Sequence, residues 1–379
     1  MKKNVFGKEL KLGVLGGGQL GRMFIQEAIN YNIDVRIMEN SLNAPSATIA
    51  STFILGDITN YQDVLSFGKD LDVLTVEIEN INIKALYELE KKGVKVFPQA
   101  RVLEIIKDKG IQKQFYADKN IPTSDFFLYD HPSSVDLSSK IPFVQKMRTG
   151  GYDGQGVQLI KNESQLNSLF DQPSIIEEMI PFTKELSVIV ARNENGETVS
   201  YQTVECEFND ANLVEFLFSP ADIDQEIEKK AEELAIRVIN ELEMVGILAV
   251  ELFLLEDGSL LVNEVAPRSH NSGHQTIECN VTSQFEQHLR SILNLPLGST
   301  ELIQYGAMIN LLGEKNFEGP AFYENFEEVM KIAGVHIHLY GKEITKPNRK
   351  MGHITVTNKK LNEAKSIAKT VKQKVRIIS

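Results

Sequence analysis

Two glutamates are candidate metal ligands because each interrupts an otherwise apolar stretch of the chain. Glu251 is the charged residue within Gly246–Leu255, and Glu264 follows shortly after Leu260–Val262. Carboxylate oxygens, together with the phosphate oxygens of a substrate, are the ligands that Mg2+ prefers. A fold that brings these two side chains together would suit a magnesium ion.

The residues between the two stretches predict that the fold does so. Asp257-Gly258 between apolar runs is typical of a two-residue β-hairpin turn. With these residues at the centre of the turn, Leu254 faces Leu261 and the two glutamates face each other. Like charges directly opposite repel each other, so a cation between them is expected. The alternative is an exposed hairpin with two unrelated glutamates, and the apolar character of both strands argues against it.

A glycine-rich segment in the middle of the chain predicts a phosphate-binding flap. Residues 149–157 contain four glycines, and the backbone amides of such a loop can fold over phosphate groups. The strand Pro142–Lys146 ends in a lysine that can meet phosphate charge. The segment is not a Walker A motif, because no Gly-Lys-Ser/Thr follows. A plain flexible hairpin is the alternative.

The N-terminal region carries a second glycine-rich turn. Gly16–Gly21 follows the strand Lys11–Leu15 and precedes a helix over Arg22–Asn30, and the next strand, Val35–Met38, ends at Glu39. This arrangement is typical of dinucleotide-binding folds, whose loop amides hold a phosphate. It makes a nicotinamide-dependent dehydrogenase one alternative function. The same turn can also serve only to pack the helix against the strand.

A linker and a carboxylate farther along the chain suit a nucleotide. The apolar pair Ile175-Ile176 leads into Glu177–Ile180, whose backbone groups can meet the edge of an adenine. Glu185 begins the strand Leu186–Ala191, and its carboxylate can bind ribose hydroxyls.

The order of elements predicts two or three domains for a chain of 379 residues. Strands alternate with helices up to about residue 105, which predicts a parallel α/β domain. A helix from Lys107 to Asn120 and an amphipathic helix over Asp224–Glu243 follow. Further short strands and a basic helix are expected at Phe53–Leu55, Val73–Ile78, Val94–Phe97, Gly306–Leu311, Gly334–Tyr340, His353–Val356 and Asn362–Lys374.

Composition narrows the functional classes. A hydrophobic content of 42% and a charged content of 24% are those of a globular protein, and no apolar run is long enough to span a membrane. No signal peptide is recognised, and two isolated cysteines fit a reducing cytoplasm. The net charge of -12 argues against nucleic acid as the main partner. The segment Gly341–Ser379 is the exception, with eleven Lys/Arg, and is expected to be either a solvated basic surface or a site for an anionic substrate.

Taken together, these motifs resemble the ATP-grasp superfamily, and within it the PurK-type N(5)-carboxyaminoimidazole ribonucleotide synthases. The resemblance covers essentially the whole chain and depends on GGGQLGR, EIEN, QKMRTGGYDGQG, NEVAPRSHNSGH and a YGK…RKMGH pattern over Tyr340–His353. It implies an ATP-grasp fold of mixed α/β and α+β class, with a Rossmann-like N-terminal domain and a small β-rich C-terminal domain. The implied boundaries are 1–105, 106–300 and 301–379, with the middle domain divided into 106–185 and 186–300.

The resemblance implies ATP- and bicarbonate-dependent carboxylation of aminoimidazole ribonucleotide in purine biosynthesis by a cytoplasmic, magnesium-dependent homodimer. Glu251 and Glu264 would bind the metal. The other residues expected at the ATP site are Lys109, Lys146, Gly151, Tyr152, Gly154, Gln155, Gly156, Glu177, Glu178, Met179, Ile180, Glu185, Asn263 and Glu264. Those expected at the ribonucleotide are Gly18, Gln19, Leu20, Glu79, Tyr152, Asp153, Arg268, His270, Lys342 and Arg349.

Within that set, Asp153, Arg268 and His270 would be catalytic. Arg268 has a planar fork suited to a bicarbonate-derived group, and either Asp153 or His270 would accept the amine proton. Two positions depart from the pattern. Ala266 stands where many grasp enzymes have a metal-binding Asn, and Phe208 stands where relatives often have His, so that position has no predicted role.

Three alternatives compete with this prediction. The dehydrogenase hypothesis explains only the first domain. Another grasp ligase, such as a formate-dependent glycinamide ribonucleotide transformylase, differs mainly in the acyl donor, and the YGK…RKMGH pattern disfavours it. A non-catalytic nucleotide-binding module would show no substrate-dependent ATP turnover.

Overall fold

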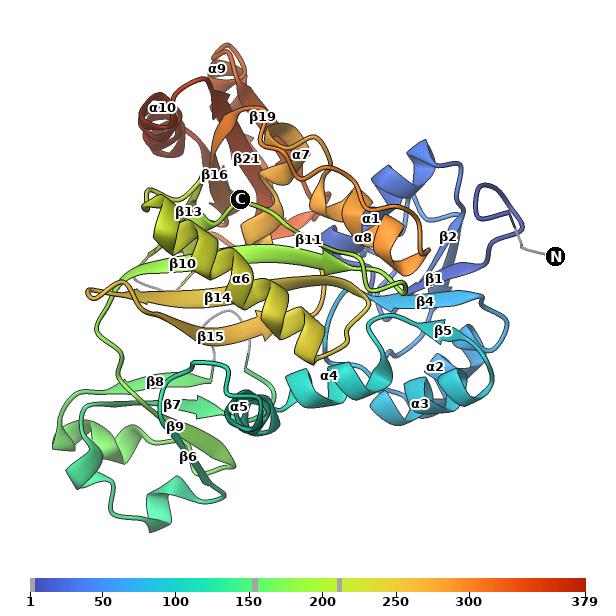
Figure 1. Ribbon diagram of the computed structural model, residues 1–379. Helices are drawn as coiled ribbons and strands as arrows, with labels where there is room; N and C mark the ends of the chain where they lie inside the picture. The colour runs from blue at the N-terminus through green and yellow to red at the C-terminus, as the bar shows by residue number, and fades with distance from the viewer. Residues whose placement is uncertain (1–3, 152–155, 210–212) are drawn as a thin grey trace.

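The computed structural model describes residues 4–151, 156–209 and 213–379. Figure 1 shows the N-terminal sheet at the right, a large central sheet across the middle and a small sheet at the lower left. The C-terminal segment lies above the central sheet. The candidate site lies where these parts meet.

The N-terminal sheet is parallel, with the strand order β3-β2-β1-β4-β5, which confirms the predicted α/β unit. Its central strands β1 and β4 are fully buried and apolar except for Thr75, because helices cover both faces of a parallel sheet. The strands are β1 (Leu12–Leu15), β2 (Val35–Glu39), β3 (Thr52–Leu55), β4 (Val73–Val76) and β5 (Lys95–Val96). The helices are α1 (Gln19–Asn30), α2 (Tyr61–Gly68), α3 (Ile83–Lys91) and α4 (Ala100–Lys107).

The helix predicted from Lys107 to Asn120 is wrong at its beginning. The chain leaves helical geometry at Asp108, and α5 (Lys109–Asp118) starts anew. The Asp108 carboxylate accepts hydrogen bonds from the amides of Gly110 and Ile111 at 2.8 and 3.2 Å. An aspartate that caps the amides of the next turn stabilises a helix start, which competes with a continuous helix.

The small sheet follows α5 and is antiparallel, in the order β6-β9-β7-β8. Its strands are β6 (Phe126–Tyr129), β7 (Phe143–Met147), β8 (Val157–Ile160) and β9 (Ser174–Glu178), and 3-10 turns lie at Pro132–Ser134, Ser138–Lys140 and Glu163–Ser168. A separate apolar cluster beneath this sheet includes Phe143, Ile160 and Ile176. The segment that carries Lys146 therefore has its own small core.

The large sheet runs in the order β15-β14-β10-β12-β13-β16-β21-β19, and β11 pairs with β10. Its strands are β10 (Phe182–Arg192), β11 (Thr198–Ser200), β12 (Val204–Phe208), β13 (Val214–Ser219), β14 (Gly246–Leu255), β15 (Leu260–Ala266), β16 (Tyr305–Leu312), β19 (Val335–Leu339) and β21 (Lys350–Asn358). The amphipathic helix α6 (Gln225–Glu241) buries its apolar face against this sheet. The strands β16, β21 and β19 of the C-terminal segment thus extend the central sheet.

The remaining elements lie in the last part of the chain, after β15. They are α7 (Thr276–Cys279), α8 (Gln284–Ile292), β17 (Gly319–Pro320), β18 (Phe322–Glu324), α9 (Phe326–Val329), β20 (Ile344–Thr345), α10 (Leu361–Lys374) and β22 (Arg376–Ile378). Ala364, Ala368 and Val371 of α10 pack into one core with β16 and β21.

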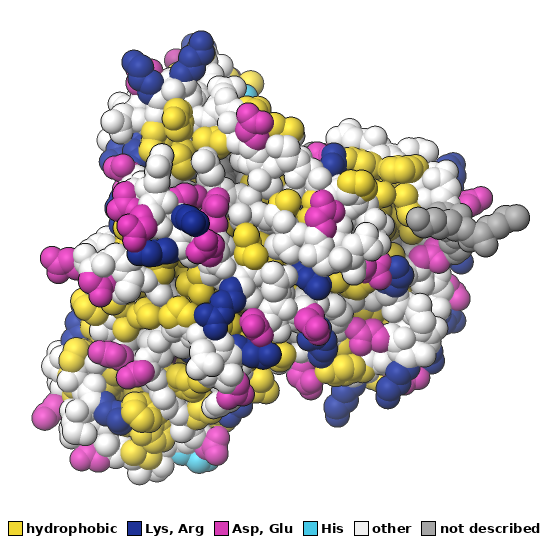
Figure 2. Space-filling model, viewed as in Figure 1, with side chains coloured by type: hydrophobic (Ala, Val, Ile, Leu, Met, Phe, Trp, Pro, Cys, Tyr) yellow, Lys and Arg dark blue, Asp and Glu magenta, His cyan; other side chains and the backbone are white. Residues whose placement is uncertain are grey.

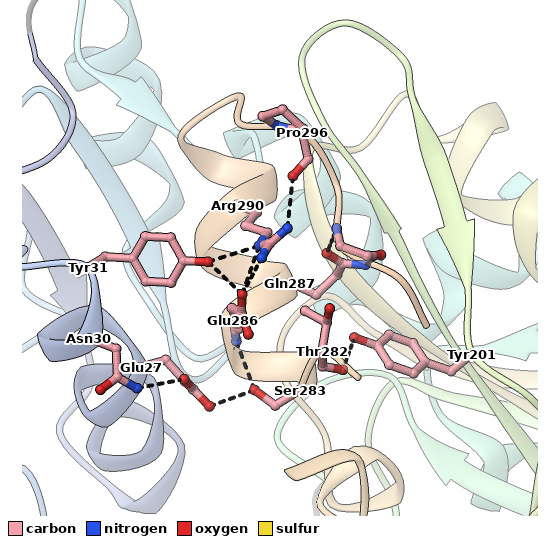
Figure 3. A network of polar contacts seen from close by, with 11 residues as sticks. Glu27, Asn30, Tyr31, Tyr201, Thr282, Ser283, Glu286, Gln287, Arg290 and Pro296 are labelled. Atoms are coloured by element: carbon pink, nitrogen blue, oxygen red, sulfur yellow. Dashed lines mark hydrogen bonds and ion pairs between the residues drawn. The ribbon is translucent and has the colours of Figure 1, made fainter. Parts of the chain in front are cut away.

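Helix α8 connects the central and N-terminal parts of the molecule (Figure 3). Tyr31 of α1 donates to Glu286 at 2.5 Å and accepts from Arg290 at 3.1 Å. Ser283, the N-cap of α8, donates to Glu27 at 2.8 Å. The two helices also share an apolar core with β1 and β2. These contacts fix α1, which begins at the glycine-rich turn, against the domain that carries the hairpin.

The surface carries both signs of charge. On the face shown in Figure 2, Lys and Arg side chains are interspersed with Asp and Glu over each part of the molecule. Within the part of the chain that the structure describes, no helix is long and apolar enough to cross a membrane.

Candidate active site

The hairpin β14–β15 places Glu251 directly opposite Glu264, as predicted. The predicted turn is wrong, however. Leu255 N donates to Ser259 O at 3.0 Å, and Gly258 has a φ of 80°, so residues 256–258 form a three-residue loop with a left-handed glycine. Leu254 consequently pairs with Leu260, and the predicted pairing with Leu261 does not occur.

A β-bulge at Asn263 restores the pairing of the two glutamates. The register shifts by one residue between Glu251 and Leu252, and Asn263 is the extra residue on β15. Bulges next to active sites commonly redirect a side chain. Here the side-chain oxygen Oδ1 of Asn263 accepts a hydrogen bond from Lys146 Nζ at 2.8 Å, which brings a β7 residue from the small sheet to the hairpin.

Lys109 is the cation that offsets the repulsion between the two carboxylates. The first residue of α5, it forms an ion pair with Glu264. The pKa of Glu264 is lowered, chiefly by the charge of Lys109. The pKa of Glu251 is raised, first by burial and then by the charge of Glu264. The pair is therefore asymmetric: Glu264 ionises more readily than Glu251.

Glu177 lies between two further lysines. Its carboxylate is 3.3 Å from Lys146 and 3.4 Å from Lys113, and its side chain is only 3% exposed. The pKa of Glu177 is lowered because these two charges outweigh the effect of burial. Lys113 also donates to Thr123 and Ser124 at 2.6 and 2.8 Å. Burial nevertheless lowers the pKa of Lys113 to about 8.

The segment predicted to hold a nucleotide spans the end of β9 and the connection to β10. Glu178 is exposed, Met179 and Ile180 are half-buried, and Phe182 N donates to Ile180 O at 3.0 Å. Glu185 on β10 is half-buried, and burial raises its pKa to about 7. The side chain of Glu177 points at the lysines, so backbone groups are what this segment can offer to a base.

The flap itself is described only at its two ends. Gly151 and Gly156 flank residues 152–155, and Gly156 O accepts from Met147 N at 2.9 Å. The predicted site residues Tyr152, Asp153, Gly154 and Gln155 lie outside the described residues. Their predicted roles stay predictions.

The glycine-rich turn before α1 is closed by the protein's own carboxylates. Gly18 N and Leu20 N donate to Glu77 at 2.5 and 3.2 Å, and Gly17 N donates to Glu39 at 3.0 Å. Glu39 is the residue that a dinucleotide would need for its ribose. The amides of the turn donate to these carboxylates, so the turn is not arranged to hold a dinucleotide phosphate. The alternative hypothesis, that the turn packs the helix against the strand, fits better.

Arg268 joins the central domain to the end of β4. Its Nε atom is 2.9 Å from Glu79, so two residues predicted at the ribonucleotide are brought together. His270 follows on the same loop, with Nδ1 2.9 Å from Ser272 Oγ and Nε2 3.6 Å from Glu251. The predicted ribonucleotide residues on this loop are therefore adjacent to the carboxylate pair.

Lys342 and Arg349 lie on the loop between β19 and β21. Lys342 Nζ donates to Lys350 O at 2.7 Å, and Arg349 Nη1 donates to Ile344 O at 2.5 Å. A Cβ placed on Gly341 would lie 3.8 Å from Arg22 Nη1, so the loop approaches the first turns of α1. Gln19 and Leu20, also predicted at the ribonucleotide, are half-buried at the start of this helix.

Family models match three consecutive regions of the chain. They describe a ribonucleotide synthetase preATP-grasp domain over residues 10–107, an ATP-grasp domain over 114–285 and a phosphoribosylaminoimidazole carboxylase C-terminal domain over 306–367. The N5-carboxyaminoimidazole ribonucleotide synthase of Bacillus subtilis is 36% identical over 94% of this chain and 93% of its own length. The chain belongs to the N5-carboxyaminoimidazole ribonucleotide synthase family of ATP-grasp enzymes.

Solved structures of this family agree in fold. The synthetase from Thermotoga maritima has a TM-score of 0.91 and 40% identity, covering 98% of this chain and 99% of that one. The Aspergillus clavatus synthase in complex with ADP and 5-aminoimidazole ribonucleotide has a TM-score of 0.87 and 33% identity, covering 96% and 98%. The phosphoribosylaminoimidazole carboxylase of Saccharomyces cerevisiae is 38% identical over 91% of this chain. The chain spans 63% of the length of that longer relative.

The carboxylate pair suits the metal that the family resemblance implies. Glu251, Glu264 and the amide of Asn263 supply oxygen donors on one edge of the hairpin. Among residues 4–151, 156–209 and 213–379, no group of three or more His, Cys, Asp or Glu side chains is placed to hold a metal ion. Mg2+ commonly binds one or two carboxylates plus substrate phosphates, so this donor set fits it.

The two departures from the family pattern are in different surroundings. Ala266 packs against the apolar cluster that includes Ile189, Ile247 and Ala249, which leaves it no metal-binding role. Phe208 is 38% exposed and pairs with Val214 at the end of β12. It remains without a role.

The sequence reasoning missed Lys113, Ser272 and Gln284. Lys113 lies four residues after Lys109, a spacing that places both on one face of α5, and this signal was available. Ser272 lies inside a motif that was recognised. Gln284 gave no signal, because only the fold brings α8 to the His270 loop.

Proposed function

We propose that the chain carboxylates 5-aminoimidazole ribonucleotide with bicarbonate at the expense of ATP, forming N5-carboxyaminoimidazole ribonucleotide. The observation that carries this proposal is the Arg268–Glu79 ion pair. It places an anion-binding arginine against the N-terminal domain, two residues before His270, which lies 3.6 Å from Glu251. The Aspergillus clavatus structure with ADP and aminoimidazole ribonucleotide supports the same two ligands here.

The first step would be phosphoryl transfer from ATP to a bicarbonate oxygen, giving carboxyphosphate and ADP. Charge spreads over the phosphoryl oxygens during such a transfer. Lys109 and Lys146 are held by Glu264 and Asn263, and both lysines would exchange these partners for phosphate oxygens. Mg2+ at Glu251 and Glu264 would supply further positive charge.

The second step would form the new carbon–nitrogen bond. The exocyclic amine attacks the carboxyl carbon of carboxyphosphate, or carbon dioxide released from it, and inorganic phosphate departs. Arg268 would orient the carboxyl group through its planar fork. His270 is held in place by Ser272, and it or Asp153 would accept the amine proton. Lys342 and Arg349 would bind the 5′-phosphate.

Other predictions belong with this proposal. The matched ranges support a division near residues 105 and 300. A homodimer and a cytoplasmic location stay predictions, to be tested by solution mass measurement and by cell fractionation.

Phosphate release tests the proposal directly. With ATP and magnesium present, release should depend on adding both aminoimidazole ribonucleotide and bicarbonate. Release that depends instead on formate and glycinamide ribonucleotide, or none with any acceptor, would contradict it. A matched reaction with NAD and no ATP serves as the control for the dehydrogenase alternative.

A further inference from the structure

The loop that carries His270 is clamped by one side chain of α8. Gln284 Oε1 accepts from His270 N at 2.9 Å, and Gln284 Nε2 donates to His270 O at 2.8 Å. A Cβ on Gly273 would lie 2.4 Å from Gln284 Oε1, so glycine is needed where the amide packs against the loop. The backbone of His270 is therefore fixed by a buried group that does not reach the substrate side.

The same amide determines the state of His274. Its NH2 group must face His270 O and its oxygen must face His270 N, which fixes the amide orientation. Gln284 Nε2 is also 3.0 Å from His274 Nδ1, so Nδ1 has to accept and the ring proton belongs on Nε2. His274 is fully buried as a neutral ring in this arrangement.

His274 begins a column of closely packed rings that runs to the basic loop. Its ring centroid is 4.7 Å from that of His353, and Tyr340 Oη is 3.0 Å from His353 Nδ1. Lys342 Nζ lies over the Tyr340 ring, 5.6 Å from its centroid. His338 stacks on the outer side of His353 at 4.5 Å. His274, Tyr340 and His353 are each at most 2% exposed.

The column joins residues that are far apart in the sequence. His274 closes the NSGH motif and His353 closes the RKMGH motif, and the proposed chemistry uses neither. Tyr340 N donates to Met351 O at 3.0 Å, so the ring column and the backbone pairing both hold the two ends of the basic loop. A close-packed interior has few voids, so a shift of one ring in the column must shift the rings that touch it.

We propose that His274, His353 and Tyr340 are positioning residues that set the distance between the phosphate-binding loop and His270. The inference rests on the proposed function, in which Lys342 holds the 5′-phosphate and the His270 loop meets the aminoimidazole. A substrate held at both ends reacts efficiently only if the two holders are correctly spaced. In the proposed function ATP meets Lys109 and Lys146, which are not part of the column, so its binding should not depend on this spacing.

Replacement of His353 separates stacking from hydrogen bonding. His353→Leu removes the ring, and it should raise the KM for aminoimidazole ribonucleotide about tenfold, the scale of coupling through packed side chains. The KM for ATP should stay within about twofold of wild type. His353→Phe keeps the stack and loses only the contact with Tyr340, so its KM for the ribonucleotide should stay within about threefold.

A matched control is His336→Leu, the same substitution on an exposed histidine of the neighbouring strand β19. It should leave both KM values unchanged. If His353→Leu does not fold, Gln284→Glu replaces it, because this nearly isosteric change removes the donors to His274 and His270 O. It should lower the kcat of ribonucleotide-dependent turnover about tenfold with an unchanged KM for ATP.

The outcomes distinguish two failures. A wild-type protein without ribonucleotide-dependent phosphate release would overturn the proposed function and the column with it. A wild type that is active, with a His353→Leu variant whose two KM values match it or rise together, would overturn the column alone. A His353→Phe variant as impaired as His353→Leu would also overturn it, because stacking would then not be the positioning contact.

Discussion

Two pairs of glutamates in this molecule have different kinds of partner. Glu39 and Glu77 face the glycine-rich turn, where backbone amides of Gly17, Gly18 and Leu20 donate to them. The hairpin pair instead faces ammonium groups and a histidine. The first pair is bound by the chain's own backbone, whereas the second is bound by flexible side chains that can change partners.

This difference is the reason that we propose the metal at the hairpin pair and not at the turn. A carboxylate that satisfies the amides at the start of a helix stabilises that helix and occupies those donors. A carboxylate held by a lysine can release it to a phosphate and accept a metal in exchange. The identity of the partner, rather than the residue type, determines the role.

The largest expected effect is at Glu264. Glu264→Gln removes an anionic ligand and should reduce magnesium-dependent ATP turnover at least about a hundredfold. The sequence alone predicts that this change relieves repulsion and stabilises the protein. The ion pair with Lys109 reverses that expectation: the metal-free variant should lose up to about 1 kcal/mol, since both side chains are partly exposed.

Glu251→Gln is the matched partner of that experiment. Because burial raises the pKa of Glu251, glutamine should leave the thermal stability of the metal-free protein unchanged while turnover still falls. Thermal melts of the metal-free variants compare their stability, and phosphate release compares their turnover. Equal stability losses in the two variants would contradict the asymmetric pair.

Substitution at the glycine-rich turn should change stability and leave ATP binding unchanged. Glu77→Ala leaves the amides of Gly18 and Leu20 without their acceptor, and should lower the free energy of unfolding by about 2 kcal/mol. The KM for ATP should not change. Glu79→Ala, two residues away, should impair ribonucleotide-dependent turnover with little loss of stability. A free energy of unfolding equal to that of wild type, measured for Glu77→Ala by chemical denaturation, would contradict this role of Glu77.

Lys113 should have a smaller effect. Lys113→Met leaves Glu177 paired with Lys146 alone, which should hold Lys146 more tightly and keep it from phosphate. We expect the KM for ATP to rise about three- to tenfold, on the scale of about 1 kcal/mol. Exposed Lys119 at the end of α5 offers a control, Lys119→Met. An unchanged KM for ATP in the Lys113 variant would show that the charge of this lysine does not affect ATP binding.

A separate expected effect is a pH dependence of stability. Burial raises the pKa of Glu77 to about 7, so the folded state binds this proton more tightly than the unfolded state. Its contribution is present below the unfolded pKa and is lost as the pH rises through about 7. The stability of wild type relative to Glu77→Gln should therefore decline between about pH 5 and about pH 8 in denaturant titrations. A rising difference would contradict the shift.

Much of the site could be predicted because its signals are local. Apolar strands identified the N-terminal sheet, and a single charge in each strand identified Glu251 and Glu264. Their pairing was correct although the turn was wrong, because a longer turn and the bulge at Asn263 offset each other. Neither feature has a reliable sequence signature when Asp-Gly fits two kinds of turn.

What escaped prediction depends on contacts between distant segments. Gln284 lies on a helix whose sequence predicts only an amphipathic surface, and the stack of His274 on His353 joins residues 79 positions apart. Glu77 lies within the EIEN motif, but nothing local indicates that its carboxylate caps α1. Such contacts are fixed by packing of one domain on another, which local patterns do not specify.

The central claim is that bicarbonate is phosphorylated by ATP before it reaches the amine. A single turnover with oxygen-18-labelled bicarbonate, ATP and aminoimidazole ribonucleotide tests this claim most directly. The attacking bicarbonate oxygen becomes the bridge of carboxyphosphate and remains on phosphorus when the carbon–oxygen bond breaks. Mass spectrometry should therefore find one heavy oxygen in the inorganic phosphate. Unlabelled phosphate, formed alongside carboxylated product, would contradict the account.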